Sequence, residues 1–277
     1  MPLRFSSPWR IRPGWVLLLL AAVAAALAVA LPAWQGRGFE AARERGALRV
    51  GVPHLPEPVA AGGKVRTPER LDGELAQRLA QDLGVPARLV QVAAADAAQA
   101  LADGTVDVVL APGAAPAGLL AVDTGYRSAP RPVMRSDTTI RSWDDMRGRI
   151  VCTAQAAWAA QRQAERSGAQ LRTYRVPSDA LVAVRTGQCD AGLVDDAVWQ
   201  PLMSMPEWKK FSATLPVQSS EPLHWLLARD AGRDAQWLAR RMQAWQSEGV
   251  YRSIAEHWAR NVAFDVYLDQ EVPDCHG

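Results

Sequence analysis

The chain has 277 residues, 49% of them apolar, which is enough for one large domain or two lobes of about a hundred residues each. The formal net charge is +2, but residues 1–31 hold three arginines and no acid, and the rest of the chain carries 28 basic and 29 acidic residues. A nucleic-acid-binding protein would show a basic surplus, so this composition argues against nucleic acid as a partner.

Residues 1–31 form the first distinct segment. Their arginines precede an apolar run from Trp15 to Leu31, seventeen residues without a charge. The pattern predicts an apolar helix that is either a cleaved signal peptide or an N-terminal membrane anchor. Ala28-Val29-Ala30 offers a cleavage site, whereas the length of the run favours retention. Either alternative exports the body to the periplasm, the second tethers it to the inner membrane, and residues 32–45 form a linker.

Export gives the cysteines a particular meaning. Cys152 ends a strand-like run, and Cys189 stands just before another. In an oxidising compartment, two such cysteines within one lobe predict a disulfide, with two buried free thiols as the alternative. Closing this loop of 37 residues would stabilise the lobe by about 3–4 kcal/mol. The pair of Cys275 and His276 offers too few ligands for a metal site. No metal or other cofactor is therefore expected.

The region from residue 46 onward predicts an α/β unit. Leucine recurs every fourth residue from Leu71 to Leu83, which indicates a helix that stops at Gly84. Strands are expected at 48–52, 87–92 and 106–111, with a further helix at 95–102. The order β-α-β-α-β predicts a mainly parallel sheet covered by helices.

A second α/β unit repeats part of the first. Gly187 and Asp190 follow Gly104 and Asp107 at an offset of 83 residues, and a helical stretch precedes each pair. The repeat predicts two lobes of similar topology with a cleft between them. The Pro-containing stretches at 128–132 and 218–222 are expected to cross between them. The first lobe then comprises residues 46–130 and 223–277, and the second comprises 131–222. The C-terminal helices are expected to pack on the first lobe; they carry Trp237, Met242, Trp245, Ile254 and Trp258.

Two carboxylates end the apolar run of the second repeat. Asp195 and Asp196 follow Ala191 to Val194 and precede a helix-like segment at 197–203. In open α/β sheets, ligands bind beyond the carboxyl ends of the strands. The alternative is that one of these aspartates only caps the helix.

The order and spacing of several motifs resemble a known family, over residues 46 to 268. The chain resembles the polar amino-acid receptors of ABC importers (solute-binding family 3), which have the type II periplasmic-binding-protein fold. The resemblance implies a two-lobed α/β protein with mainly parallel sheets flanked by helices. It also implies a small-molecule solute, a monomer, and a partner that is an inner-membrane permease or another periplasmic protein. The motifs are LRVGV, LDGELAQRLAQDLGV, ALADGTVDVVLAP, SWDDMRGRIVC, VRTGQCDAGLVDD, WQSEGVYRSIAEHW and FDVY.

The ligand residues of the family are only partly present. The aspartate that receives the ligand's amino group falls on Asp195, but the segment 113–120 lacks the arginine for the carboxylate. The family's Gly-Thr pair becomes Ala156-Ala157. A zwitterion would therefore be poorly matched, which favours a cationic or neutral solute. Four further candidates lie near predicted strand ends, although packing or surface exposure is the alternative for each: Gln155, Trp158, His54 and Tyr126.

Three functions from different classes follow. The first is an exported protein that captures a small polar or cationic solute for an ABC importer. The second is a membrane-tethered accessory or sensory protein with a degenerate cleft. The third is an enzyme, because a dehydratase is known on this fold, but the four histidines lie in no catalytic motif and no enzyme is predicted.

Overall fold

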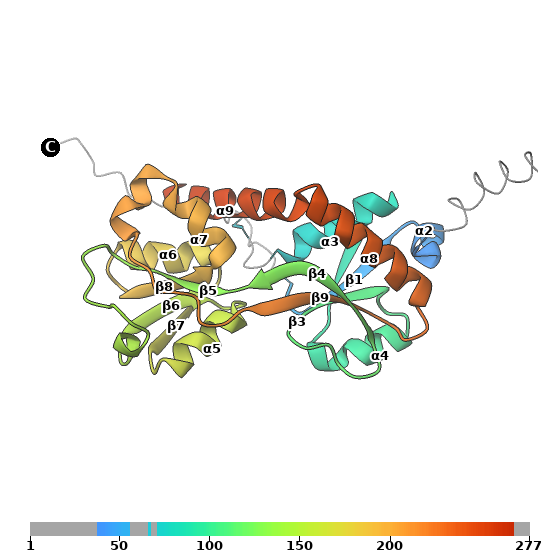
Figure 1. Cartoon of the computed structure of the whole chain (residues 1–277), viewed down its shortest axis with the longest axis horizontal. Coiled ribbons are helices and arrows are strands. Elements are labelled where there is room, and N and C mark those ends of the chain that lie inside the picture. Colours follow the sequence, from blue (N-terminus) through green and yellow to red (C-terminus); the bar gives the residue numbers. More distant parts are fainter. Residues whose placement is uncertain (1–37, 56–65, 68–70, 269–277) are drawn as a thin grey trace, which may run out of the picture. The chain divides into compact units, whose positions relative to one another are not determined.

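Two separate β-sheets organise the chain in this computed structural model (Figure 1). The structure describes residues 38–55, 66–67 and 71–268. The signal peptide or anchor expected at 1–31, like Cys275, lies outside them. Within the described ranges, no helix has the length and apolarity needed to cross a membrane.

The first sheet has five strands in the order β2-β1-β3-β9-β4. β1 pairs in parallel with β2 and β3, whereas β9 pairs antiparallel with β3 and β4. β1 and β3 are almost wholly buried, as expected for apolar strands covered on both faces. The strands are β1 (Leu48–Val52), β2 (Ala87–Gln91), β3 (Val108–Pro112), β4 (Leu120–Ser128) and β9 (Glu221–Leu227).

Helices pack along this sheet. The leucine repeat forms α3, which buries Leu75, Leu79 and Leu83 and ends at Gly84 in the left-handed conformation with φ 73°. The helix predicted from the leucine repeat is therefore confirmed, because a spacing of four residues places these leucines on one face. The helices are α2 (Glu40–Arg45), α3 (Asp72–Leu83), η1 (Ala94–Asp96), α4 (Ala97–Ala102) and α8 (Gly232–Ser247).

The second sheet has four strands in the order β5-β8-β6-β7. β6 is parallel to β7 and β8, and only β5 runs antiparallel. Its strands are β5 (Pro130–Val133), β6 (Ile150–Ala154), β7 (Gln170–Tyr174) and β8 (Ala191–Asp195). Its helices are η2 (Asp144–Met146), α5 (Trp158–Arg166), α6 (Pro177–Arg185), α7 (Asp196–Met203) and η3 (Pro206–Phe211).

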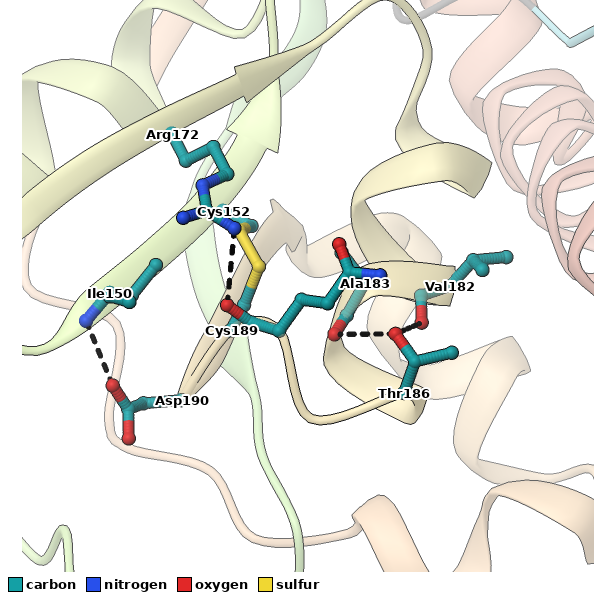
Figure 2. Close-up of a disulfide and its surroundings, with 9 residues drawn as sticks. Ile150, Cys152, Arg172, Val182, Ala183, Thr186, Cys189 and Asp190 are labelled. Carbon is teal, nitrogen blue, oxygen red and sulfur yellow. Dashed lines mark hydrogen bonds between the residues drawn. A yellow bond between two sulfur atoms is a disulfide. The ribbon is translucent and has the colours of Figure 1, made fainter.

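The repeat found in the sequence has the same geometry in both sheets. Asp107 accepts a hydrogen bond from the backbone N–H of Arg49 at 2.8 Å, and Asp190 accepts one from Ile150 at 2.8 Å (Figure 2). In return, each aspartate N–H donates to the carbonyl of the same residue at 2.9 Å. Each aspartate thus joins the start of the third strand of its unit to the first strand.

The chain passes between the sheets at the two expected places. Only Ala129 separates β4 from β5, and β9 returns to the first sheet after residues 214–220. The two-lobed α/β fold with mainly parallel sheets is confirmed, while the lobe boundaries at 130, 131, 222 and 223 remain a prediction.

Helix α9 (Val250–Leu268) departs from the expected arrangement. α8 contacts β4 of the first sheet, but α9 contacts α7 and α6 of the second as well as α8 (Figure 1). Its buried face includes Trp258, Ala259, Val262 and Val266. The expectation that all C-terminal helices pack on the first lobe is therefore wrong for α9, because an amphipathic pattern defines a buried face without naming its partner.

The predicted disulfide is confirmed. Cys152 in β6 and Cys189 before β8 are bonded, and their Cα atoms lie 6.0 Å apart (Figure 2). Both side chains are buried, with 0% and 5% of their surface exposed. The bond joins the strand β6 to the turn after α6, within the second sheet and its helices.

Candidate functional site

The register of the strands brings the ends of the two crossing segments together. Ser128, the last residue of β4, pairs with Glu221, the first residue of β9. Two residues later, Pro130 pairs with Asp195, the last residue of β8. Glu221 and Asp195 therefore both lie beside the segment by which the chain leaves the first sheet. The sequence motifs around these residues do not show this neighbourhood, since it depends on pairing over long sequence separations.

A small cavity of about 50 Å³ lies at this junction. Its wall combines residues from β3, β4 and β9 of the first sheet with residues from α5 and β8 of the second. α9 adds Trp258 to the wall. The lining residues are Leu71, Asp72, Pro112, Tyr126, Ser128, Pro130, 156–160, Val194, Asp195, Glu221, Leu223 and Trp258.

Asp195 lies at the cavity wall and caps α7. One carboxylate oxygen accepts from the N–H of Ala197 at 3.0 Å, and the other accepts from the Ser128 hydroxyl at 2.7 Å. The Tyr126 hydroxyl and the backbone of Ala129 also donate to it. Both proposals made for this residue, helix cap and cavity wall, therefore describe the same carboxylate.

All four donors to Asp195 are neutral. Burial raises the pKa of this carboxyl above its usual range, and the hydrogen bonds from Ser128, Ala197, Tyr126 and Ala129 offset only part of the effect. A cation placed in the cavity would supply the missing opposite charge and favour the ionised form.

Acidic and aromatic side chains share the cavity. Asp72, with 4% of its surface exposed, and Glu221 line it together with Asp195. Three aromatic side chains face the same space: Tyr126, Trp158 and Trp258. No lysine, arginine or histidine is among the lining residues that the structure describes. This wall suits a positive charge, which can contact carboxylates and the faces of aromatic rings.

A larger cavity of about 430 Å³ shares Pro112, Trp158 and Glu221 with the small one. It lies beyond the carboxyl ends of β1, β2 and β3, where ligands of open α/β sheets bind. Its volume is in the range of small-molecule sites, about 300–1,000 Å³. The other lining residues are Pro53, Ala93, Ala94, Gly113 and Arg162.

An ion pair connects the two sides of the larger cavity. Arg162 on α5 pairs with Glu221 at the start of β9. Their side chains remain 48% and 30% exposed, so water screens the pair. Arg162 is thus the basic side chain at the cavity, and it comes from α5 rather than from the segment 113–120 where the family resemblance places an arginine.

The structure brings together three of the five predicted ligand residues, Asp195, Trp158 and Tyr126. Gln155 is exposed and lines neither cavity; its N–H donates to the carbonyl of Tyr174 at 2.6 Å. His54 is half-buried and is likewise absent from both linings. Within the described part of the chain, no group of three or more His, Cys, Asp or Glu side chains is arranged to hold a metal ion.

Four charged or aromatic lining residues were not predicted from the sequence. The segments that contain Asp72, Arg162 and Glu221 were interpreted only as helices or as crossings between the lobes. Trp258 was expected to pack on the first lobe. Asp72 directly follows the first leucine of the α3 repeat, which is the one local signal that could have suggested a helix-start carboxylate facing the cleft.

No family model matches the chain, and no curated protein sequence matches it either. Solved structures do match over most of its length. An ancestral cationic amino acid solute-binding protein is 20% identical, with a TM-score of 0.58, and the match covers 79% of this chain and 98% of that one. The chain has the two-lobed fold of the type II solute-binding proteins.

Two further structures with this solute-binding fold are similar. One is an ancestral amino acid-binding protein described as a precursor of cyclohexadienyl dehydratase (21% identity, TM-score 0.54, 79% and 98% covered). The other is a putative ABC transporter binding component from Wolinella succinogenes in complex with lysine (20% identity, TM-score 0.53, 77% and 96% covered). At these identities the likeness establishes the fold, and the ligand must be argued from the cavity residues of this chain.

Proposed function

We propose that the protein is an exported solute-binding protein that captures a small cationic solute between its lobes and delivers it to the permease of an ABC importer. The observation that carries this proposal is the composition of the junction cavity. Three carboxylates and three aromatic rings line it, and no basic side chain among the described residues does so. A desolvated carboxylate with only neutral donors, as at Asp195, gains most from a cationic ligand.

The two cavities divide the solute between them. The small cavity has room for a charged group such as an ammonium, and the larger one for the remainder of the molecule. The larger wall is mostly small and apolar, with the Trp158 ring on one side. The solute is therefore an organic cation with an apolar stem, not a bare metal ion. A free amino acid is a weaker candidate, since Arg162 is already paired with Glu221 and leaves a solute carboxylate poorly matched.

The structural neighbours are consistent with this class of ligand. One is a cationic amino acid solute-binding protein, and another was solved in complex with lysine. For this chain we propose the periplasm as the location and a monomer as the binding form. The neighbours do not favour the accessory-protein alternative, and we propose no catalytic reaction.

Calorimetric titration tests the proposal. Lysine, putrescine and tetramethylammonium represent cations, and alanine and glutamate serve as the neutral and acidic comparison. We expect at least one cation to bind, and Asp195→Asn to weaken its binding by about 2–5 kcal/mol, because the ligand charge loses its partner. Asp196→Asn is the matched control, since Asp196 pairs with Arg131 and lines neither cavity.

The opposite pattern would contradict the proposal. Tight binding of alanine or glutamate that Asp195→Asn leaves unchanged would show that the cavity does not select a positive charge. Absence of binding across the panel would move the function to the accessory-protein alternative.

A further inference from the structure

The Arg162–Glu221 pair occupies a special position relative to the two cavities. Glu221 borders both of them, whereas Arg162 is among the lining residues of the larger one only. The Arg162 guanidinium therefore binds the Glu221 carboxylate from the side of the larger cavity. The same carboxylate also faces the small cavity. This is the same class of contact that a cationic solute would make with Glu221.

We propose that Arg162 is a built-in competitor of the solute for Glu221, and that Glu221 is a charge-selecting residue of the site. This inference rests on the proposed binding function. Arg162 carries a guanidinium on a flexible stem from α5, and a solute cation that enters the cavity displaces it into solvent. The competition lowers the affinity for every cation and excludes those that cannot replace a guanidinium at the carboxylate.

Because both side chains of the Arg162–Glu221 pair are partly exposed, replacing Arg162 by a solute cation at Glu221 costs little free energy. Both side chains retain contact with water, at 48% and 30% of their surface, so the released Arg162 is readily hydrated. Exposed ion pairs contribute little net free energy, because solvation and side-chain entropy offset the attraction. The Trp158 ring also borders both cavities.

A purely structural role predicts the opposite sign. If the pair served only to hold α5 against β9, removing Arg162 would loosen the closed arrangement and weaken solute binding. A competitor, in contrast, strengthens binding when it is removed. The direction of the change therefore separates the two roles.

The experiment is a double-mutant cycle by calorimetry with putrescine and tetramethylammonium as the probes, neither of which carries a carboxylate that Arg162 could bind. The variants are Arg162→Ala, Glu221→Gln and the combination of both. We expect Arg162→Ala to tighten cation binding about three- to tenfold, by removing both the competing partner and a repelling charge. Glu221→Gln should weaken binding, and the gain from Arg162→Ala should disappear in the Glu221→Gln background.

Matched variants control for effects of charge alone. Arg166 lies one turn further along α5 and donates to Gln163 and Ser219 instead of Glu221. We expect Arg166→Ala to change affinity by less than about twofold, in line with the small contribution of exposed charges. Arg162→Lys keeps the positive charge, so its affinity for the cation should stay close to that of the wild type.

Three results would overturn the inference. Weaker or unchanged cation binding by Arg162→Ala, with binding by the wild type intact, would reject the competitor role and leave the proposed function standing. An equal gain with and without Glu221 would reject Glu221 as the contested carboxylate. Absence of cation binding by every variant would reject the proposed function together with the inference.

Discussion

Asp195 joins three segments of the chain through one carboxylate. It caps α7 by accepting a hydrogen bond from the N–H of Ala197, and it accepts another from the hydroxyl of Ser128 at the end of β4. The same carboxylate faces the cavity. The sequence suggested a cap or a ligand residue as alternatives, since an aspartate between a strand and a helix fits both. The hydrogen bond from Ser128 depends on the meeting of two distant strands, so no local pattern could predict it.

The raised pKa of Asp195 leads to a pH-dependent stability. The folded protein holds the proton more tightly than the unfolded chain, in which the pKa is about 3.9. The stabilising contribution is therefore complete below that value and is lost as the pH rises through the folded pKa. We expect the free energy of unfolding of the wild type to fall, relative to that of Asp195→Asn, as the pH increases from about 3.9.

Urea unfolding at a series of pH values, followed by tryptophan fluorescence, checks this prediction. Asp196→Asn serves as the control, because its carboxylate pairs with Arg131 and shows a half-exposed surface. Parallel pH profiles for the wild type and Asp195→Asn would contradict the prediction.

At the scale of elements, α3 and α8 are joined by one buried carboxylate. Asp82 on α3 accepts from Arg241 at 2.8 Å and from the indole N–H of Trp245 at 2.7 Å, and its side chain is 8% exposed. Burial alone would raise the pKa of Asp82, but the hydrogen bonds from Arg241 and Trp245 outweigh it and lower the pKa. The stability from this carboxylate is thus present above its unfolded pKa and is lost as the pH falls through the folded value.

Asp82→Ala should therefore destabilise the protein at pH 7. We expect a loss of about 2–4 kcal/mol, because two donors on α8 lose a charged acceptor. Asp103→Ala is the control, since Asp103 is exposed and its carboxylate accepts hydrogen bonds from the neighbouring Gln99 side chain. Urea denaturation measures both changes, and a loss below about 0.5 kcal/mol for Asp82→Ala would reject the structural role.

The aspartate repeat shows what a sequence pattern can and cannot reveal about elements. Gly104 and Gly187 both have positive φ, 63° and 77°, so the turn before each strand uses the freedom of glycine. The aspartates that follow bind the backbone of Arg49 and Ile150 in the same manner. The similarity of the two units was predictable from the sequence. The residues whose backbone N–H groups donate to the two aspartates became known only from the strand pairing.

At the scale of the whole molecule, the disulfide and α9 restrain the second sheet in different ways. Cys152–Cys189 closes a loop of 37 residues around α5, β7 and α6. Reduction should lower the free energy of unfolding by about 3–4 kcal/mol on the loop-entropy model. Urea unfolding with and without a phosphine reductant tests this, with a Cys152→Ser/Cys189→Ser variant that should not respond to the reductant.

A reductant effect of equal size in that double variant would show that the loss does not come from this bond. Cys275 is the remaining cysteine in the variant, so the same comparison reveals any contribution it makes.

α9 links parts of the chain that the sequence keeps far apart. Its buried Asp265 accepts from the N–H of Thr67 at 2.7 Å, in the segment before α3, while the helix contacts α6 and α7. Through the same helix, Trp258 reaches the cavity wall. The sequence identifies Trp258 as a residue of an amphipathic helix and nothing more, since helical periodicity carries no information about the surface against which the face packs.

The sequence by itself predicted the helix α3, the strands β1, β2 and β3, the two-sheet α/β class and the disulfide between Cys152 and Cys189. These depend on short-range signals: apolar periodicity, turn glycines, and strand-end positions within one unit. Only the tertiary structure decided that Glu221 and Arg162 meet across the larger cavity, that Asp72 and Trp258 share a wall with Asp195, and that α9 packs on the second sheet's helices. Each of these depends on contacts between residues far apart in the chain, which are set by the register and packing of complete sheets rather than by any local pattern.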